Sequence, residues 1–456
     1  MAGAAGGTEM AAVYDVLVRY DAETQQFEPQ LAKAVEVAPD QLGWTITLRD
    51  GVTFSDGSPL DSRAVKWSIE RFVAGKGTGS ELWSDTVTDI STPDAATVVV
   101  TLDKPWSDFE SMLASGFGLV VAPSSQNGDV FTPIGAGPFV VDRFAQREEL
   151  VLNARPDYWA GSPNLEKLRF VSLGGDQNTL ESLKSNGIQM AFLRSPEVVD
   201  QARSANLPGF IDTQDLGSIG VINNRPGRPG SDVRVRQAMA YAIDPQALDD
   251  RVNNGTGLPG SDMFPSFSQW HTDVAGLPTD PDRAKSLLDE AKADGYDGRL
   301  SFLSLQEPTA QRRALAVQAM LQAVGFTVTI DYVNSATDQT KRVLVDHDFD
   351  AAGSSLSLND AVPFQRLNTH LQSSSVLNSA GYSNPEMDSL LAELQTAKTA
   401  DEKRPIFARI QQVVNDTVPF ATWSAQAVFV PWTSSVHGVT PTLDSVILFD
   451  KVWIEQ

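Results

Sequence analysis

Hydrophobic and polar positions alternate regularly near the start of the chain. In residues 44–48 apolar side chains alternate with threonines, and this period of two predicts a strand. Asp-Gly dipeptides at 50–51 and 56–57 predict turns. From Asp61 the apolar spacing becomes that of a helix, and Asp61 is a suitable N-cap for the segment "DSRAVKWSIERFVAG". The pattern therefore predicts a strand, a turn region and a helix in succession.

The same mixture of elements continues to the C-terminus. Strands are expected in residues 92–105, and in 139–144 and 150–155, which we expect to pair with each other. Helices are expected in residues 280–295 and 401–420, and a helix, a glycine and a strand in residues 307–333. A helix that leads back to a strand is typical of α/β crossover connections. With no internal repeat and no low-complexity linker, the chain is expected to form several α/β lobes.

The size and charge of the chain limit its partners. The 456 residues correspond to two to four domains at roughly 100–200 residues each. The formal net charge is −23, from 35 basic and 58 acidic residues, and such a surface repels phosphate backbones. We therefore expect no nucleic-acid partner. No apolar run is long enough to span a bilayer, and the start of the chain, "MAGAAGGTEMAAVYDVL", is not a signal peptide.

Motifs for catalysis, metals and cofactors are absent from the sequence. There is no cysteine and no Gly-x-Ser-x-Gly elbow, and the four histidines are dispersed. The acidic segment "DHDFD" (346–350) is interpreted as a solvated loop before a strand rather than as a metal site. A Ser-His-Asp site assembled by folding is a less favoured alternative. We therefore predict no catalytic residue, no metal and no cofactor.

Two glycine-rich stretches raise the question of phosphate binding. The segment "GTGLPG" (255–260) matches Gly-x-Gly-x-x-Gly, but it follows a helical stretch, and Pro259 lacks a backbone donor. In "IGAGPF" (134–139), Pro138 again lacks an N–H group, and a strand follows instead of a helix N-terminus. Both stretches are therefore poor phosphate sites.

Several segments, in order along the chain, resemble the family 5 extracellular solute-binding proteins, the substrate-capture subunits of ABC importers. They are "YDVLVRYD" with "PQLAKAVEV", "GWTITLRDGVTFSDGSPLDSRAVKWSIERF", "IGAGPFVVDRF", "LNARPDYWAGSPNLEKLRF", "DVRVRQAMAYAIDPQAL", "DPDRAKSLLDEA" and "YSNPEMDSLLAELQTA". The resemblance covers nearly the whole chain. It places "IGAGPF" at a structural corner between lobes, where glycines permit tight backbone geometry.

The resemblance implies a fold of the α/β class: a two-lobed periplasmic-binding-protein-like fold of type II, the large peptide-binder type, with an extra α/β lobe and a ligand cleft between lobes. We expect a discontinuous main N-terminal lobe formed by residues 1–30, 131–224 and 426–456. The extra lobe is expected at 31–130 and the C-terminal lobe at 225–425. Hinges are expected near Asn223-Asn224 and Phe420–Trp423.

Two departures from the family pattern affect what the resemblance implies. Members carry a longer N-terminus with a secretion signal, often a lipid-bearing cysteine, and a first strand, none of which this chain shows, and we interpret this as a truncation. Peptide binders of the family also carry Gly-Trp-x-x-Asp, whose aspartate pairs with the peptide α-amine. The corresponding segment here is "AAGSSLSLNDAVPF" (351–364), where serines replace that aspartate. A peptide with a free amine is therefore not the expected ligand.

The function implied is non-enzymatic capture of a peptide-like or oligosaccharide-like solute by closure of the lobes. Expected partners are this solute and the transmembrane permease subunits, with the protein a monomer located outside the cytoplasm, either periplasmic or anchored as a lipoprotein. A hydrolase and a ligand-binding sensor remain as alternatives. A site of this kind combines aromatic walls with a few polar groups. The predicted ligand-binding residues are Tyr14, Asn223, Arg225, Trp270, Ser354, Ser355, Ser357, Asn359, Asp360 and Trp423.

Overall fold

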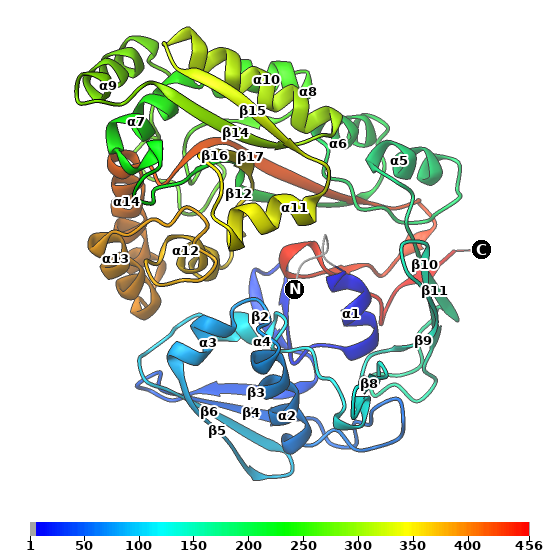
Figure 1. Ribbon diagram of the computed structural model, residues 1–456. Coiled ribbons are helices and arrows are strands. Elements are labelled where there is room, and N and C mark those ends of the chain that lie inside the picture. Colours follow the sequence, from blue (N-terminus) through cyan, green and yellow to red (C-terminus); the bar gives the residue numbers. More distant parts are fainter. Residues whose placement is uncertain (1–5, 456) are drawn as a thin grey trace. The chain divides into compact units, whose positions relative to one another are not determined.

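The computed structural model describes residues 6–455 of the chain, which form two compact units of mixed helices and strands (Figure 1). Unit 1 contains Met1–Leu193, Gln201–Asp212 and Val428–Gln456. Unit 2 contains Arg194–Asp200 and Thr213–Ala427. Within the described range no helix is long and apolar enough to cross a membrane.

The first layer of unit 1 is a four-stranded antiparallel sheet with the order β3-β4-β6-β5. Its strands are β3 (Ala32–Val37), β4 (Gly43–Leu48), β5 (Val87–Asp94) and β6 (Thr97–Leu102), and α2 (Ser62–Ala74) and α3 (Ser80–Thr86) pack against it. Trp44, Ile46 and Leu48 are all buried, which confirms the predicted alternation. The side chain of Asp61 accepts a hydrogen bond from the backbone N–H of Ala64, which confirms the predicted N-cap.

The second layer of unit 1 is a three-stranded antiparallel sheet with the order β11-β10-β9. It consists of β9 (Phe139–Ala145), β10 (Glu149–Ala154) and β11 (Lys167–Val171), and the predicted pairing of the first two strands is confirmed. The helix α5 (Asp176–Lys184) follows β11, and α1 (Gly7–Tyr14) packs beside β9. The remaining elements of this unit are β1 (Val18–Asp21), β2 (Gln26–Pro29), α4 (Glu110–Leu113), β7 (Gln126–Asn127), β8 (Val130–Phe131), β18 (Val436–His437), β19 (Thr440–Pro441), β20 (Ile447–Leu448) and β21 (Trp453–Ile454).

The glycines of "IGAGPF" lie against the backbone at the end of α1. A Cβ atom added to Gly135 would lie 2.2 Å from the carbonyl oxygen of Val13, and one on Gly137 would lie 2.4 Å from that of Ala12. The N–H group of Gly137 donates to the carbonyl of Val13 at 2.9 Å. The buried guanidinium of Arg155 donates to the carbonyls of Gly135 and Gly137 at 3.3 and 3.4 Å. The glycines are needed for this close approach, because neither has a positive φ.

Replacing Gly135 by alanine is expected to lower the free energy of unfolding of unit 1 by about 1–3 kcal/mol, because the added methyl group overlaps the Val13 carbonyl. Urea denaturation followed by circular dichroism measures the effect. Gly260→Ala is the matched control, since no atom lies within 4 Å of its added Cβ. Equal stability of the two variants would contradict the packing argument.

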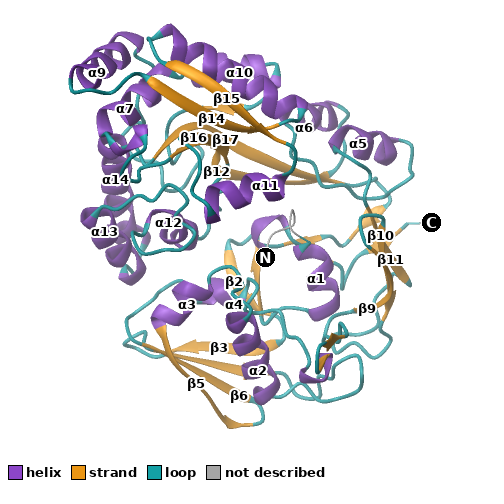
Figure 2. Ribbon diagram, in the orientation of Figure 1, coloured by secondary structure: helices purple, strands orange, loops and turns teal. Residues whose placement is uncertain are grey.

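The centre of unit 2 is a six-stranded sheet with the order β13-β17-β12-β16-β14-β15 (Figure 2). Its strands are β12 (Gly209–Ile222), β13 (Leu258–Pro259), β14 (Arg299–Leu305), β15 (Thr327–Val333), β16 (Ala351–Ser354) and β17 (Phe420–Pro431). The helix α10 (Pro308–Ala323) connects β14 to β15, which pair in parallel, so the predicted helix, glycine and strand are confirmed. β12 and β16 pair antiparallel.

Unit 2 contains further helices, and several of them begin with side-chain caps. They are α7 (Val233–Ala242), α8 (Pro245–Asn253), α9 (Pro281–Ala293), α11 (Ala336–Thr340), α12 (Pro363–Leu371), α13 (Pro385–Thr396) and α14 (Ala400–Thr417). Asp280 caps α9, and Thr399 with Glu402 forms a capping box at the start of α14. The predicted helices at 280–295 and 401–420 are therefore confirmed.

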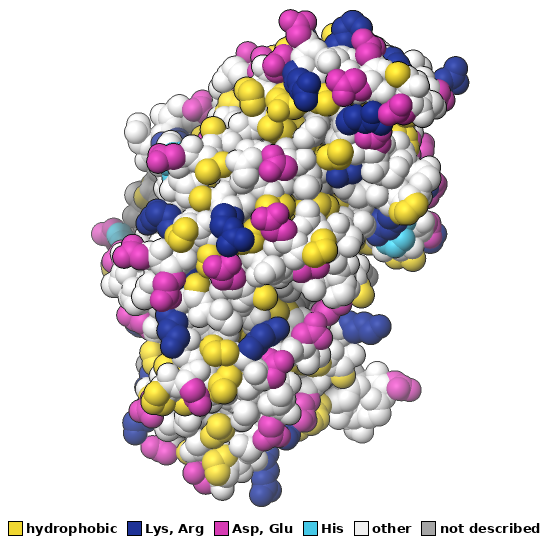
Figure 3. All heavy atoms as spheres, turned by 90° about the vertical axis from the view of Figure 1, so that its left-hand side faces the viewer, with side chains coloured by type: hydrophobic (Ala, Val, Ile, Leu, Met, Phe, Trp, Pro, Cys, Tyr) yellow, Lys and Arg dark blue, Asp and Glu magenta, His cyan; other side chains and the backbone are white. Residues whose placement is uncertain are grey.

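The chain passes between the units within two long strands and near α6 (Pro196–Ser204). β12 crosses at Asp212–Thr213 and β17 at Ala427–Val428. The sequence predicts hinges near 223–224, just after the end of β12, and near 420–423, at the start of β17. Residues 31–130 belong to unit 1 in this division. On the face drawn in Figure 3, basic and acidic side chains are interspersed, so no area of one sign dominates it.

Candidate ligand-binding segment of unit 2

Residues 354–360 leave the end of β16 and run back beside β12. The N–H group of Asp215 donates to the carbonyl of Leu358 at 2.9 Å, and that of Ser357 donates to the carbonyl of Leu216 at 2.5 Å. An isolated bridge joins Gln214 to Asn359. These backbone bonds hold the segment in a fixed register against the strand. We call residues 354–360 the serine segment.

Leucines anchor the serine segment while its polar side chains remain accessible. Leu356 and Leu358 are buried, whereas Ser354 and Ser355 are exposed and Ser357 is partly exposed. The hydroxyl groups of Ser355 and Ser357 lie 2.8 Å apart, and Ser357 has a φ of 51°. The segment therefore presents neighbouring hydroxyl groups on a backbone that is fixed by its apolar side.

The carboxylate of Asp360 is engaged by neighbouring groups of unit 2. It accepts from the hydroxyl of Ser268 at 2.5 Å and from the backbone N–H of Gln269 at 3.2 Å. Its carbonyl accepts from the indole N–H of Trp270 at 2.7 Å. Trp270 is buried and packs on Phe407 with ring centroids 4.7 Å apart. Trp270 therefore anchors the end of the serine segment.

A second carboxyl group, on Asp215, completes this cluster. The hydroxyl of Ser268 lies 3.3 Å from a carboxyl oxygen of Asp215, which is fully buried. Burial raises the pKa of Asp215 to about 9, and the nearby charge of Asp360 raises the pKa further in the same direction. Asp215 is therefore a neutral carboxylic acid at pH 7. Sequence patterns gave no signal for Asp215 or Ser268, because only folding brings them to Asp360.

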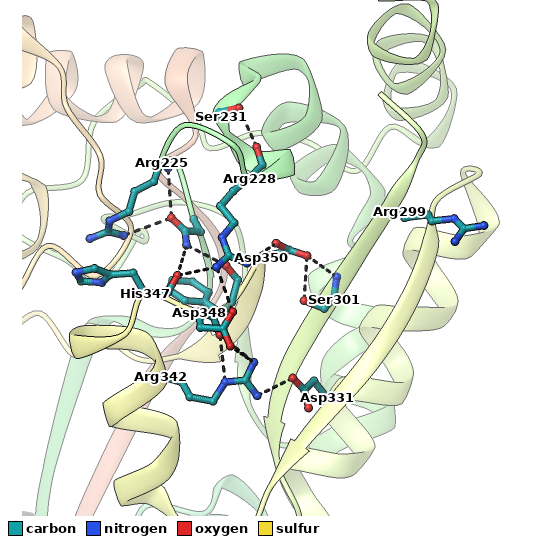
Figure 4. Close-up of polar contacts among 12 residues, drawn as sticks. Arg225, Arg228, Ser231, Arg299, Ser301, Asp331, Arg342, His347, Asp348 and Asp350 are labelled. Carbon is teal, nitrogen blue, oxygen red and sulfur yellow. Dashed lines mark hydrogen bonds and ion pairs between the residues drawn. The ribbon is translucent and has the colours of Figure 1, made fainter. Parts of the chain in front are cut away.

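Asn223 and Arg225 hold the chain that precedes the serine segment. Figure 4 labels Arg225 and His347 in this region. The fully buried amide of Asn223 donates to the carbonyls of His347 and Phe349 at 3.0 and 2.9 Å. Its oxygen accepts from the backbone N–H and the guanidinium of Arg225 at 3.2 and 3.3 Å. The guanidinium also donates to the carbonyl of Ser379 at 2.8 Å. Both side chains thus make structural contacts within unit 2.

The aspartates of "DHDFD" are paired with arginines in the same region (Figure 4). Arg228 contacts Asp348 at 3.1 Å and Asp350 at 3.4 Å, and Arg342 contacts Asp348 at 3.2 Å. Residues 6–455 contain no group of three side chains that could hold a metal ion. The segment precedes β16, which begins at Ala351.

Two further predicted residues, Trp423 and Tyr14, belong to different units of the chain. Trp423 is buried in the core of unit 2, near Phe302 and directly over Gly220, where an added Cβ would lie 2.4 Å from its ring. Tyr14 is half-buried at the end of α1 in unit 1, and burial raises the pKa of its hydroxyl. The structure thus brings together Trp270, Asp360 and the serine segment.

The glycine stretch 255–260 does not present free donors to an anion. The backbone N–H of Gly257 donates to the carboxylate of Asp249 at 3.0 Å. A carboxylate already occupies the place that a phosphate would need, so the weak motif match has a structural explanation.

Comparison with known proteins identifies the family to which the chain belongs. Residues 26–378 match the bacterial extracellular solute-binding proteins, family 5, so the chain belongs to this family. Members of the family are binding proteins rather than enzymes, which confirms the binding function and excludes the hydrolase alternative.

Two relatives align with most of this chain. DdpA of Escherichia coli K12, named as a D,D-dipeptide-binding periplasmic protein, is 24% identical over 425 residues, which are 89% of this chain and 81% of DdpA. A Brucella ovis protein named as an ABC transporter peptide-binding protein is 27% identical over 352 residues, 74% of this chain and 66% of that protein.

Solved structures share the fold. AgaA of Agrobacterium tumefaciens R10 in complex with agropinic acid superposes with a TM-score of 0.84 at 24% identity, over 100% of this chain and 95% of AgaA. DppA of Helicobacter pylori with the peptide STSA gives 0.84 at 22% identity, over 100% of this chain and 94% of DppA. These matches confirm the periplasmic-binding-protein-like α/β fold.

The buried carboxyl group of Asp215 predicts a pH-dependent stability. The pKa of Asp215 is about 9 in the folded protein and 3.8 in its usual state. Between pH 3.8 and pH 9 the folded state therefore binds one more proton than the unfolded state. Between pH 5 and 8 the free energy of unfolding should therefore fall by about 1.4 kcal/mol per pH unit relative to Asp215→Asn. Urea unfolding of both proteins at pH 5, 6.5 and 8 measures this difference. Parallel pH dependences would contradict a neutral Asp215.

Proposed function

We propose that the protein captures a small amino-acid-derived solute, of peptide or opine type, and delivers it to the permease of an ABC importer. The observation that supports this best is the serine segment, whose hydroxyl groups are exposed while its only carboxylate, that of Asp360, is engaged by Ser268 and Gln269. Hydroxyl and amide groups bind the polar atoms of such a solute without requiring it to carry a charge.

The charge of the cluster supports a ligand without an obligatory ammonium group. A bound ammonium needs a carboxylate that is ionised and accessible. Asp215 is protonated at pH 7 because of its burial, and Asp360 already accepts two hydrogen bonds from unit 2. In the segment 351–364, serines stand where the family resemblance places the aspartate that pairs with a peptide amine. The favoured solute therefore has a blocked, substituted or absent α-amine.

The ligands of the relatives support an amino-acid-derived solute. DdpA is named for D,D-dipeptides, DppA holds the peptide STSA, and AgaA holds agropinic acid. An oligosaccharide, which the hydroxyl-rich segment also fits, is the alternative within this binding function. A ligand-binding sensor would use the same binding step without transport. A requirement for the permease distinguishes the importer function from the sensor function.

The partner and the location follow from the same proposal. The protein acts outside the cytoplasm as a monomer, either free in the periplasm or anchored to the membrane by a lipid. Lobe closure would change backbone angles where the chain crosses between units, at Asp212–Thr213 and Ala427–Val428. The permease would recognise the closed form.

Blocking the amine of a dipeptide is expected to change affinity by less than about threefold, which corresponds to less than about 0.7 kcal/mol. A thermal-shift panel of Ala-Ala, N-acetyl-Ala-Ala, agropinic acid and maltose first identifies the solute class, and calorimetry then compares the acetylated and free forms. A loss of about tenfold or more on acetylation would contradict the proposal. Stabilisation by maltose alone would favour an oligosaccharide, and a change in the mass of the recovered solute would indicate an enzyme.

The serine segment is tested directly by Ser355→Trp. Because the Ser355 side chain is exposed beside Ser357, the indole should cover the neighbouring hydroxyl groups and weaken binding of the solute found by the panel by about tenfold or more. Ser286→Trp is the matched control, since Ser286 is an exposed residue of α9 in the same unit. Equal affinities of the two variants in calorimetry would remove the serine segment from the site.

A further inference from the structure

Arg313 differs from two other arginines near β16 because its charge has no partner. At the start of this strand, Arg228 and Arg342 are each paired with an aspartate of residues 346–350. Arg313 lies on α10, and its side chain is partly buried. Among residues 6–455 its guanidinium makes no hydrogen bond and no ion pair. Withdrawing a charge from water without a partner is costly, so this arginine needs an explanation.

The side chain of Arg313 lies over the end of β16. A Cβ atom added to Gly353 would lie 3.5 Å from Cδ and 3.6 Å from Nη1 of Arg313. The guanidinium therefore lies where a side chain at 353 would extend. The serine segment begins with the next residue, and the amide of Gln339 on α11 donates to the carbonyl of Gly353 at 3.4 Å. The end of β16 is thus flanked by a guanidinium, an amide and the exposed hydroxyl groups of the serine segment.

Aromatic rings cover the same face of the sheet beside the guanidinium. Gly220 of β12 is paired with Gly353, and opposed residues of an antiparallel pair face the same side. An added Cβ atom would lie 2.4 Å from the Trp423 ring at Gly220, and 3.9 Å from the Phe302 ring at Gly353. The indole N–H of Trp423 is itself buried without an acceptor in the described chain. These rings therefore leave the N–H groups of the guanidinium available to another molecule.

Glu307 is the acidic residue whose charge acts on Arg313. Burial lowers the pKa of Arg313, and the charge of Glu307 raises it again. Glu307 is exposed at the N-cap position of α10, and no hydrogen bond or ion pair joins the two side chains in the described chain. Moving the carboxylate onto the guanidinium would withdraw a second charge from water. Glu307 is therefore a poor permanent partner.

We propose that Arg313 binds a carboxylate group of the captured solute, which is therefore an organic acid rather than a neutral molecule. The two oxygens of a carboxylate match the planar donors of a guanidinium. Ser355 and Gln339 offer donors for other oxygens of the solute. The carboxylate belongs to the same solute that the serine segment is proposed to bind, so this assignment rests on the proposed function.

A carboxylate suits this position better than an inorganic anion does. One guanidinium balances the single charge of a carboxylate, whereas a phosphate group carries more than one charge at neutral pH. The net charge of the protein, −23, opposes the approach of a multiply charged anion. Phosphate therefore serves as a comparison probe in the experiment.

Nitrogen NMR of the arginine side chains tests the site in the unmodified protein. The probes are N-acetylalanine, its neutral amide, and inorganic phosphate. The Nε–H signal of Arg313, assigned by its loss in Arg313→Gln, should shift and saturate with the acid, with about tenfold or more weaker binding of the amide. The absence of a saturable shift up to about 50 mM acid would overturn the proposal, as would equal affinity for acid and amide. Tighter binding of phosphate than of the acid would overturn the assignment to a carboxylate.

Variants of two adjacent arginines separate a local contact from a general effect of charge. Arg313→Gln should weaken binding of N-acetylalanine by about tenfold or more, because a charge-assisted hydrogen bond is lost, and Arg313→Lys should recover part of this loss. Arg312→Gln is the matched control, since it removes the same charge from the preceding residue, whose guanidinium donates to the carbonyl of Val252 at 3.0 Å. Equal losses in the two glutamine variants would contradict a contact with Arg313.

Urea unfolding without any probe distinguishes a binding role from a structural role. Arg313→Met keeps an extended side chain over Gly353 and removes the unpaired charge, so its urea midpoint should be at least as high as that of the natural protein. A lower midpoint would assign Arg313 to structure and overturn the proposal. A solute panel without a hit, together with a saturable Arg313 shift, would refute the proposed import function and support the anion site. A solute bound equally well by Arg313→Gln would refute the site alone.

Discussion

The candidate site depends on one buried amide. Asn223 has no contact with solvent, so each of its polar atoms must find a partner inside unit 2. It finds them in the carbonyls of His347 and Phe349 and in Arg225. These bonds fix where the chain enters β16, and the serine segment follows directly from that strand. Asn223, which the sequence predicts as a ligand contact, thus holds in place the strand from which the serine segment follows.

The serine segment and the carboxyl cluster together are the basis of the charge proposed for the ligand. Leu356 and Leu358 pack inwards, and the backbone pairs with β12, so the hydroxyl groups cannot move away from their positions without disrupting the core. At the end of the segment, two carboxyl groups share the hydroxyl of Ser268. Because one of them is neutral, the cluster carries one negative charge, and unit 2 already solvates that charge with its own donors.

The sequence predicts the fold much better than it predicts the site. Periodicity and caps are local properties, so the strand at 44–48, the cap at Asp61 and the helix beginning after Asp280 could be read directly. The crossings between units could be placed only approximately, because β12 and β17 continue through them without a break in pattern. Trp423 and Trp270 lie in similar sequence surroundings, yet only folding decides that one joins the core and the other binds the Asp360 carbonyl. Asp215 lies far along the chain from Asp360, so no spacing rule could connect them.

Backbone hydrogen bonding explains why the two units differ. In unit 2, β14 and β15, which are joined by the crossover helix α10, pair directly in the large sheet. In unit 1 the equivalent crossover leaves two edges that face a groove, while the floor between them is already built from core side chains. The same accounting of donors and acceptors that assigns Asn223 to structure therefore leaves the outer edge of β11 without a backbone partner among residues 6–455.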